Sequence, residues 1–143
     1  MIREALPTEV MAVTAIDLAC FGRQAWSVAA VQAMLDDDRR TVLHDDLEAY
    51  AVIAVAGDVA DLERIAVMPS RRRRGVARGL LDALTVAAGA QGATRMLLEV
   101  AADNDAALAF YESYGFTTIS TRVGYYPGGV DAVVMQLDLE EAR

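Results

Sequence analysis

The sequence contains no lysine. All thirteen of its basic residues are arginine, and they are outnumbered by twenty-one acidic residues, so the formal net charge is −8. Proteins that bind nucleic acid without sequence preference need a broad basic surface, and this charge therefore argues against that class and against a nucleic-acid partner. Four of the arginines are consecutive, at positions 71–74, and Gly75 follows them directly. In so acidic a chain, this block predicts a local site for an anion.

Cysteine is also scarce. The single cysteine, Cys20, excludes an internal disulfide and favours a reducing compartment. It lies in an apolar helical stretch, residues 16–22, where we expect it to pack rather than react. No apolar run approaches the roughly 20 residues that cross a bilayer, and the amino-terminal residues lack a signal-peptide pattern. We expect a cytoplasmic protein that has no membrane partner.

The apolar pattern predicts one α+β domain over residues 1–143. Apolar residues make up 55% of the chain, enough for a packed core at this length. Alternating or continuous apolar runs predict strands at residues 1–5, 39–44, 49–57, 59–67, 94–100, 116–123 and 131–139. Helical spacing and capping residues predict helices at residues 6–21, 28–38, 75–92 and 105–114. We therefore expect a single mixed sheet of about six to seven strands flanked by about four helices.

The arginine block lies between a predicted strand that ends at Pro69 and a predicted helix that opens at Gly75. A helix start has unpaired N–H groups and a partial positive charge, which together attract phosphate. Gly75 and Ala77 are small enough for a pyrophosphate to approach the main chain. A solvated basic loop is the alternative. The Gly-Lys-Ser/Thr ending of a nucleotide-triphosphate loop and the three glycines of a dinucleotide loop are both absent. A pyrophosphate site without these patterns points to coenzyme A.

Three segments resemble GCN5-related N-acetyltransferases (GNAT). The segment RRRGVA, residues 72–77, is similar to the pyrophosphate turn Q/R-x-x-G-x-G/A of that family. The segment RIAVMP, residues 64–69, resembles the preceding strand, and residues 97–116 resemble the second half of the fold. Within the family the chain is most similar to the RimI type, which acetylates the amino-terminal alanine of a small-subunit ribosomal protein. The resemblance implies the GNAT fold, acetyl-coenzyme A as the donor, and no metal.

The resemblance also assigns residues to the cofactor. It implies that backbone N–H groups polarise the thioester carbonyl, that Asn104 binds the pantetheine arm, and that the arginine turn binds the pyrophosphate. The implied strand residues are Ile65, Ala66 and Val67. The implied turn residues are Arg72, Arg73, Arg74, Gly75, Val76, Ala77 and Arg78. Access to the strand requires that it separate from one neighbour, which the sequence does not indicate.

Glu99 is the candidate general base. Alternation along its predicted strand places Glu99 with Leu97 and Ala101 on one face and Leu98 on the other. A carboxylate among apolar neighbours is expected to have a raised pKa and to accept a proton. An α-amino group has a pKa of about 7.7–8.0 against about 10.4 for lysine, so deprotonating lysine costs roughly three kcal/mol more. A single carboxylate therefore suits an α-amine; the alternative is that Glu99 simply ends the strand in solvent.

Tyr111 is the candidate general acid. It follows Asn104 by seven residues, about two helical turns, so both lie on one helix face. In the resemblance Tyr111 protonates the coenzyme A sulfur, and a phenol with a pKa near 10 remains a donor at neutral pH. The alternative is core packing, which we expect for the nearby Phe110, Tyr114 and Phe116.

Two other titratable residues are weaker candidates. Glu63 is a competing base, and strand alternation places it with Asp61 and Ile65; we favour a salt bridge to a nearby arginine. His44 has acidic neighbours, and we expect a surface residue at a strand end. No group of His, Cys and carboxylate residues has metal-ligand spacing.

The acceptor is expected to be the amino-terminal peptide of a ribosomal or other protein, which in the family begins with alanine followed by basic residues. The resemblance places the acceptor cleft beside Trp26, Tyr125, Tyr126 and Asp131. Transfer to a lysine or a small amine is one alternative, and a non-catalytic coenzyme A sensor or assembly partner is another. We expect a monomer or weak dimer.

Overall fold

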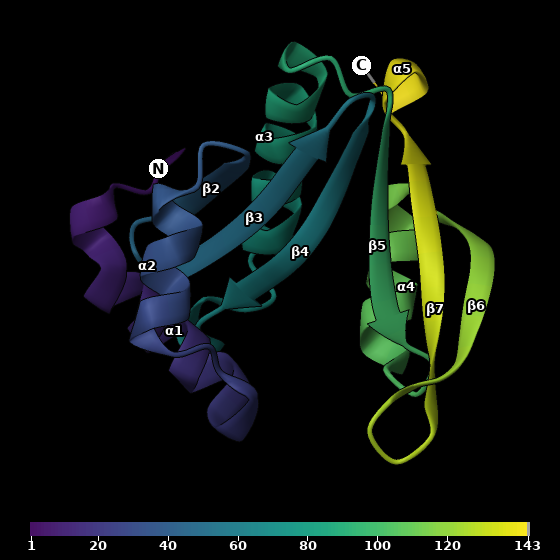
Figure 1. Cartoon of the computed structure of the whole chain (residues 1–143), viewed down its shortest axis with the longest axis horizontal. Coiled ribbons are helices and arrows are strands. Elements are labelled where there is room, and N and C mark those ends of the chain that lie inside the picture. The colour runs from purple at the N-terminus through teal and green to yellow at the C-terminus, as the bar shows by residue number, and fades with distance from the viewer. Residues whose placement is uncertain (143) are drawn as a thin grey trace.

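The structure is a computed structural model that describes residues 1–142, and its centre is one seven-stranded sheet (Figure 1). The strands are β1 (Ile2–Glu4), β2 (Arg40–Asp45), β3 (Ala49–Ala56), β4 (Val59–Val67), β5 (Arg95–Ala101), β6 (Thr117–Tyr126) and β7 (Val130–Asp138). Their order across the sheet is β1-β2-β3-β4-β5-β7-β6. Only β4 and β5 pair in parallel; the other neighbours are antiparallel. The expected mixed sheet is confirmed.

Four helices of nine residues or more flank the sheet, as predicted. They are α1 (Val10–Phe21), α2 (Val28–Asp36), α3 (Val76–Ala90) and α4 (Asp105–Tyr114), and a short α5 (Leu139–Ala142) follows β7. The predicted caps are present: Ser27 Oγ accepts a hydrogen bond from Ala30 N at 3.1 Å, and Asn104 Oδ1 accepts one from Ala107 N at 3.2 Å. Among residues 1–142, no helix is long and apolar enough to cross a membrane.

The helices form two layers, one on each face of the sheet. On one face, α1 and α2 bury a cluster that includes Val13, Ile16, Val31, Met34, Val42, Tyr50 and Val52. On the other face, α3 and α4 pack on a larger cluster that includes Leu80, Leu81, Leu84, Met96, Leu98, Phe116 and Met135. The two helices of that layer are also joined by the Tyr114 hydroxyl, which donates to Asp82 at 2.6 Å.

The two parallel strands separate after a short paired segment. Residues Val59–Asp61 of β4 pair with Arg95–Leu97 of β5. Beyond this segment β4 continues to Val67 and β5 to Ala101, but the two strands no longer pair with each other. Figure 1 shows the two strands starting side by side and diverging toward their carboxyl ends. The separation of β4 from one neighbour that the resemblance implies is therefore present. Beyond Asp61, β4 keeps a paired neighbour only on its β3 side.

A bulge in β4 overturns one expectation about Glu63. In the β3 pairing, Val52 lies opposite Arg64 while Ile53 lies opposite Leu62, so Glu63 is the extra residue. The bulge reverses the alternation: Leu62 packs in the α3 layer, and two residues later Arg64 points to the α1 layer. The prediction that Glu63 and Ile65 share a face is therefore wrong. The predicted salt bridge is confirmed, since Arg40 Nε lies 2.6 Å from Glu63 Oε1.

The expectation of a surface position for His44 is also wrong. Its side chain is fully buried, and its Nδ1 accepts a hydrogen bond from Leu47 N at 3.1 Å. The Nε2 atom lies 3.5 Å from Glu9 Oε1 and has no hydrogen-bond partner among the described residues. Burial lowers the pKa of the imidazole. The cause is β1 and the turn before α1, which cover β2 at this point.

Candidate active site

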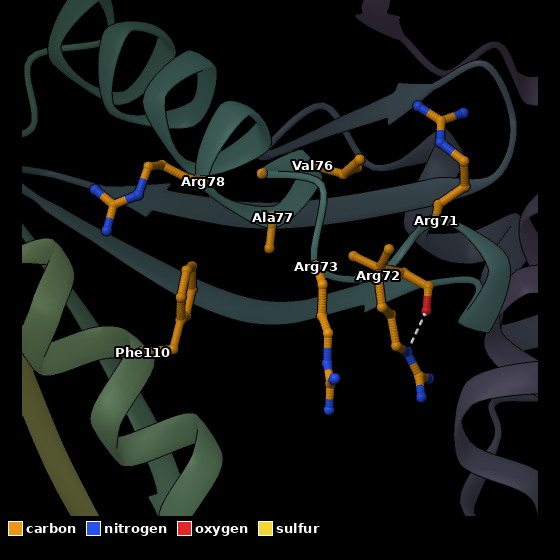
Figure 2. A pocket seen from close by; sticks show the side chains of 9 residues that line it. Arg71, Arg72, Arg73, Val76, Ala77, Arg78 and Phe110 are labelled. Atoms are coloured by element: carbon orange, nitrogen blue, oxygen red, sulfur yellow. Dashed lines mark hydrogen bonds between the residues drawn. The ribbon is translucent and has the colours of Figure 1, made fainter.

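The arginine turn leads into an uncapped helix start. Gly75 is the N-cap residue of α3 with φ +75°, and it supplies no side-chain cap to the first turn. The first N–H groups of a helix have no partner within the helix, so they are available to a ligand. Beside them is a cavity of about 380 Å³. It is lined by Val67, Arg71, Arg72, Arg73, Gly75, Val76, Ala77, Arg78 and Phe110 (Figure 2).

The arginines of the block point in different directions. Figure 2 shows Arg72 and Arg73 extending in parallel, with Arg71 directed away from them. Arg72 Nε donates to the Val67 carbonyl at 2.9 Å, which fixes the turn against β4. Arg71 forms an ion pair with Glu48 at 3.3 Å. Arg73 has no ion pair with any residue of 1–142, and Arg74 does not line the cavity. The turn therefore presents Arg73 to a ligand most freely.

A second cavity of about 450 Å³ continues from the turn along β4. It shares Val67, Arg72, Arg73, Ala77 and Phe110 with the first cavity. Ile65 and Ala66 form its β4 side, and α4 forms the opposite side through Ala106, Ala107, Phe110 and Tyr111. Five lining residues are not among the predicted site residues: Cys20, Phe21, Ala106, Ala107 and Phe110. Phe110 was assigned to the core, and Cys20 was expected only to pack, whereas its Sγ lies 3.3 Å from the Val67 carbonyl beside the cavity.

A third cavity of about 560 Å³ lies where β4 and β5 have separated. It shares Phe21, Ile65, Ala107 and Tyr111 with the second cavity. Glu99, Asn104 and Tyr126 also line it, so the structure brings both catalytic candidates to one space. The three cavities together, called the groove below, run from the start of α3 past Tyr111 to Glu99.

Tyr111 lies at the centre of the groove. Its ring packs against Phe110 at 5.3 Å and Phe116 at 5.6 Å between ring centres. No hydrogen bond joins its hydroxyl to any residue of 1–142, so the hydroxyl is available to a bound molecule. Burial raises the pKa of Tyr111 to about 12, which keeps the phenol protonated at neutral pH.

Glu99 lies in a more polar environment than expected. The predicted alternation of β5 is confirmed, since Met96, Leu98 and Val100 are buried and Glu99 faces the other side. The expected apolar surroundings are wrong: the Glu99 side chain is 29% exposed, and its Oε1 lies 3.4 Å from Arg122 Nε. The cause is the separation of β4, which opens this face of β5. Exposed pairs of this kind are weak, so Arg122 does not hold the Glu99 carboxylate in one position.

The four acceptor candidates do not all reach the groove. Tyr126 lines it beside Glu99. Tyr125 is 52% exposed and packs under Arg122 at 5.3 Å, and Asp131 Oδ1 accepts a hydrogen bond from Gly124 N at 2.8 Å. Trp26 lines a separate cavity of about 290 Å³, which also contains Glu63. Asp131 thus orders the β6–β7 hairpin, and Trp26 lies on the far side of Glu63.

Comparison with known proteins places the chain in a family. Residues 15–116 match the family described as "Acetyltransferase (GNAT) family". The chain belongs to this family. The matched segment of this GNAT chain contains the arginine turn, both separated strands and Tyr111, and so covers the groove except for Tyr126, Pro127 and Val130.

Individual GNAT relatives are similar over much of their length. The [ribosomal protein bS18]-alanine N-acetyltransferase of Salmonella typhimurium is 42% identical over 98 residues, which are 66% of this chain and 66% of that protein. The N-alpha-acetyltransferase RimI of Mycobacterium tuberculosis is 40% identical over 98 residues, 64% of this chain and 60% of that protein. The match thus spans slightly less than two thirds of these relatives.

Solved structures resemble the whole chain. A crystal structure of the Escherichia coli ribosomal-protein alanine N-acetyltransferase has a TM-score of 0.86 and 32% identity, and covers 97% of this chain and 93% of that chain. Ard1 from Thermoplasma volcanium has a TM-score of 0.84 and 25% identity over 96% of both chains. The expected GNAT fold and the resemblance to the RimI type are confirmed.

Proposed function

We propose that this chain transfers the acetyl group of acetyl-coenzyme A to the amino-terminal alanine of a small-subunit ribosomal protein. The observation that carries the proposal is the continuous groove from the uncapped start of α3 to Glu99. The names of two RimI-type relatives support the acceptor. We infer that residues 1–143 form one acetyltransferase domain, since one sheet extends from β1 to β7.

The residues at the α3 end of the groove fit a nucleotide pyrophosphate. The N–H groups of the first turn of α3, with Arg73 and Arg78 at the rim, would hold the phosphates by charge-assisted hydrogen bonds. The unpaired edge of β4 at Ile65–Val67 and the Asn104 side chain would hold the pantetheine arm, which brings an activated acetyl group when bound.

Glu99 and Tyr111 would move the protons. Glu99 accepts a proton from the attacking amine, directly or through a water molecule, and the partly exposed position makes a water relay accessible. Tyr111 donates its hydroxyl proton to the departing sulfur, and its free hydroxyl fits this role. Backbone N–H groups of β4 polarise the carbonyl that is attacked. The amine attacks directly, and no residue of the chain is acylated.

Acetyl transfer to a peptide beginning Ala-Arg tests the proposal. The purified protein is incubated with acetyl-coenzyme A and this peptide, and intact-mass measurement detects one added acetyl group. The same sequence with a blocked amino terminus and an internal lysine, and a polyamine, are the competing acceptors. We expect a preference for the free α-amine. A preference for lysine or polyamine contradicts the acceptor assignment but retains the enzyme class.

A paired variant separates catalysis from cofactor binding. The double substitution Glu99→Gln, Tyr111→Phe is expected to abolish transfer while coenzyme A still binds, as measured by calorimetry. If the double variant is as active as the unaltered protein, the assigned acid and base are wrong. If neither protein binds coenzyme A, the chain is not an acetyltransferase of this mechanism.

A further inference from the structure

A buried carboxylate lies in the middle of α1, where the sequence is otherwise apolar. Asp17 is fully buried, yet its two oxygens are well supplied with donors. Oδ1 accepts from the Tyr50 hydroxyl at 2.5 Å and from Arg64 Nε at 2.8 Å. Oδ2 accepts from Trp26 N at 2.7 Å and from Arg64 Nη2 at 3.0 Å. A buried charge is tolerated only when it is paired in this way, so the geometry of the partners is tightly constrained.

Arg64 connects this carboxylate to the segment between α1 and α2. Its guanidinium lies 3.8 Å from the centre of the Phe21 ring and 4.2 Å from that of Trp26. Its Nη2 also donates to the Gln24 carbonyl at 3.1 Å. One side chain of β4 therefore holds residues 21–26 by ring contacts, a backbone hydrogen bond and the shared Asp17 carboxylate. We call residues 21–26 the acceptor wall.

The acceptor wall forms one side of the reaction space. Phe21 and Gln24 line the groove cavity that contains Glu99 and Tyr111, and Arg64 lines it too. Arg64 precedes Ile65, which belongs to the strand expected to hold the thioester. The bulge at Glu63 is what turns Arg64 toward α1 and leaves Ile65 facing the groove. Arg64 therefore contacts α1 and Ile65 packs in the α3 layer, while both line this cavity.

We propose that Arg64 is a positioning residue for the acceptor: it fixes the acceptor wall against β4, so that the peptide's α-amine binds beside Glu99. The inference rests on the proposed function for the identity of the acceptor. Arg64 acts through Phe21, Gln24 and Trp26 rather than on the reacting atoms. Lysine cannot replace it, because a single ammonium cannot form a bidentate pair, stack between two rings and reach the Gln24 carbonyl at once.

The substitution Arg64→Lys tests the role. We expect KM for the Ala-Arg peptide to rise by about tenfold to a hundredfold, as for other small displacements of positioning groups. The KM for acetyl-coenzyme A and the affinity for coenzyme A should stay within about twofold, because the arginine turn is untouched. Trp26 is the only tryptophan in the sequence, so its fluorescence reports on the acceptor wall. Acrylamide should quench Trp26 more strongly in the variant than in the unaltered protein.

The matched control is Tyr50→Phe, which removes a hydrogen bond to the same Asp17 carboxylate from the β3 side. We expect a lower melting temperature but no change in peptide KM or Trp26 quenching. Should Arg64→Lys fail to fold, Phe21→Leu removes one of the two ring contacts and is expected to give the same pattern, smaller in size. An unchanged peptide KM in a folded variant, or an equal loss of coenzyme A affinity, overturns the positioning role. A parent protein that acetylates no α-amine overturns the proposed function, and this acceptor role with it.

Discussion

The hydroxyl of Tyr111 is expected to contribute to catalysis and almost nothing to stability. The substitution Tyr111→Phe removes one oxygen that has no hydrogen bond to the described residues. The ring contacts with Phe110 and Phe116 are retained. Since no buried partner is left unsatisfied, the free energy of unfolding should change by less than about 0.5 kcal/mol.

The expected loss of kcat is much larger. A positioned general acid contributes about 10²- to 10⁴-fold, which corresponds to about 3 to 5 kcal/mol of activation free energy. The affinity for coenzyme A should not change, because the hydroxyl is not needed at the pyrophosphate end. Burial raises the pKa of Tyr111 to about 12, so the residue stays protonated and kcat should show no titration of this group between about pH 6 and pH 10.

Tyr114→Phe is the matched control, one turn further along α4. Its hydroxyl donates to Asp82 at 2.6 Å, so its loss should cost about 1 kcal/mol of stability with little effect on kcat. The assay combines urea unfolding with steady-state release of free coenzyme A thiol. The assignment is refuted if Tyr111→Phe retains more than about a tenth of the parent kcat. It is also refuted if the two variants lose activity in proportion to their lost stability.

Three further predictions concern the turn and the buried histidine. Arg73→Gln should weaken coenzyme A binding by about tenfold in calorimetry, whereas Arg74→Gln, outside the cavity, should change it by less than about twofold. In thermal melts, Gly75→Ala should lower stability by about 1 kcal/mol because φ is +75° there, even though no atom lies within 4 Å of the added Cβ. Gly79→Ala, inside α3, should raise stability by about 0.5–1 kcal/mol. Burial lowers the pKa of His44 below 6.5, so the unfolded chain takes up the proton first as the pH falls. The contribution of neutral His44 to the free energy of unfolding is therefore present above pH 6.5 and is lost as the pH falls below that value. The substitution His44→Asn should make the free energy of unfolding, measured in urea, less dependent on pH between about pH 5 and pH 7.

Local rules were sufficient to predict most of the fold. Apolar periodicity located all seven strands and the four long helices, and short-range capping placed the starts of α2 and α4 at Ser27 and Asn104. These features depend on residues within a few positions of each other. His44 was misplaced because its burial depends on β1 and the turn before α1, more than thirty residues away. The sequence around His44 contains no sign of that cover.

The candidate site likewise combines features that the local sequence predicts with features that depend on distant contacts. The α3 start was predicted from the arginine block and Gly75, and Tyr111 and Glu99 were assigned with the help of the family resemblance. The fold brings the three to one groove. The bulge at Glu63 was missed, because a bulge is decided by the pairing of two strands rather than by the composition of either. Asp17 gave a usable signal, since an acidic residue in an apolar helix stretch must find a buried partner. Its partner Arg64 could not be chosen from thirteen arginines without the fold.

The arginine block shows how similar residues acquire different tasks. Arg71 binds Glu48 in the β2–β3 turn, and Arg72 binds the carbonyl of Val67 at the end of β4. Both contacts fix the loop before α3. Arg73, in the same loop, has the left-handed conformation at φ +64° and lines the cavity with a guanidinium that forms no ion pair with residues 1–142. Because backbone in this conformation is strained for a residue other than glycine, the two anchored arginines stabilise the strained turn that exposes the N–H groups of α3. Two of the four arginines of the block are therefore structural, and the anion site that we propose consists of the helix start with Arg73 and Arg78.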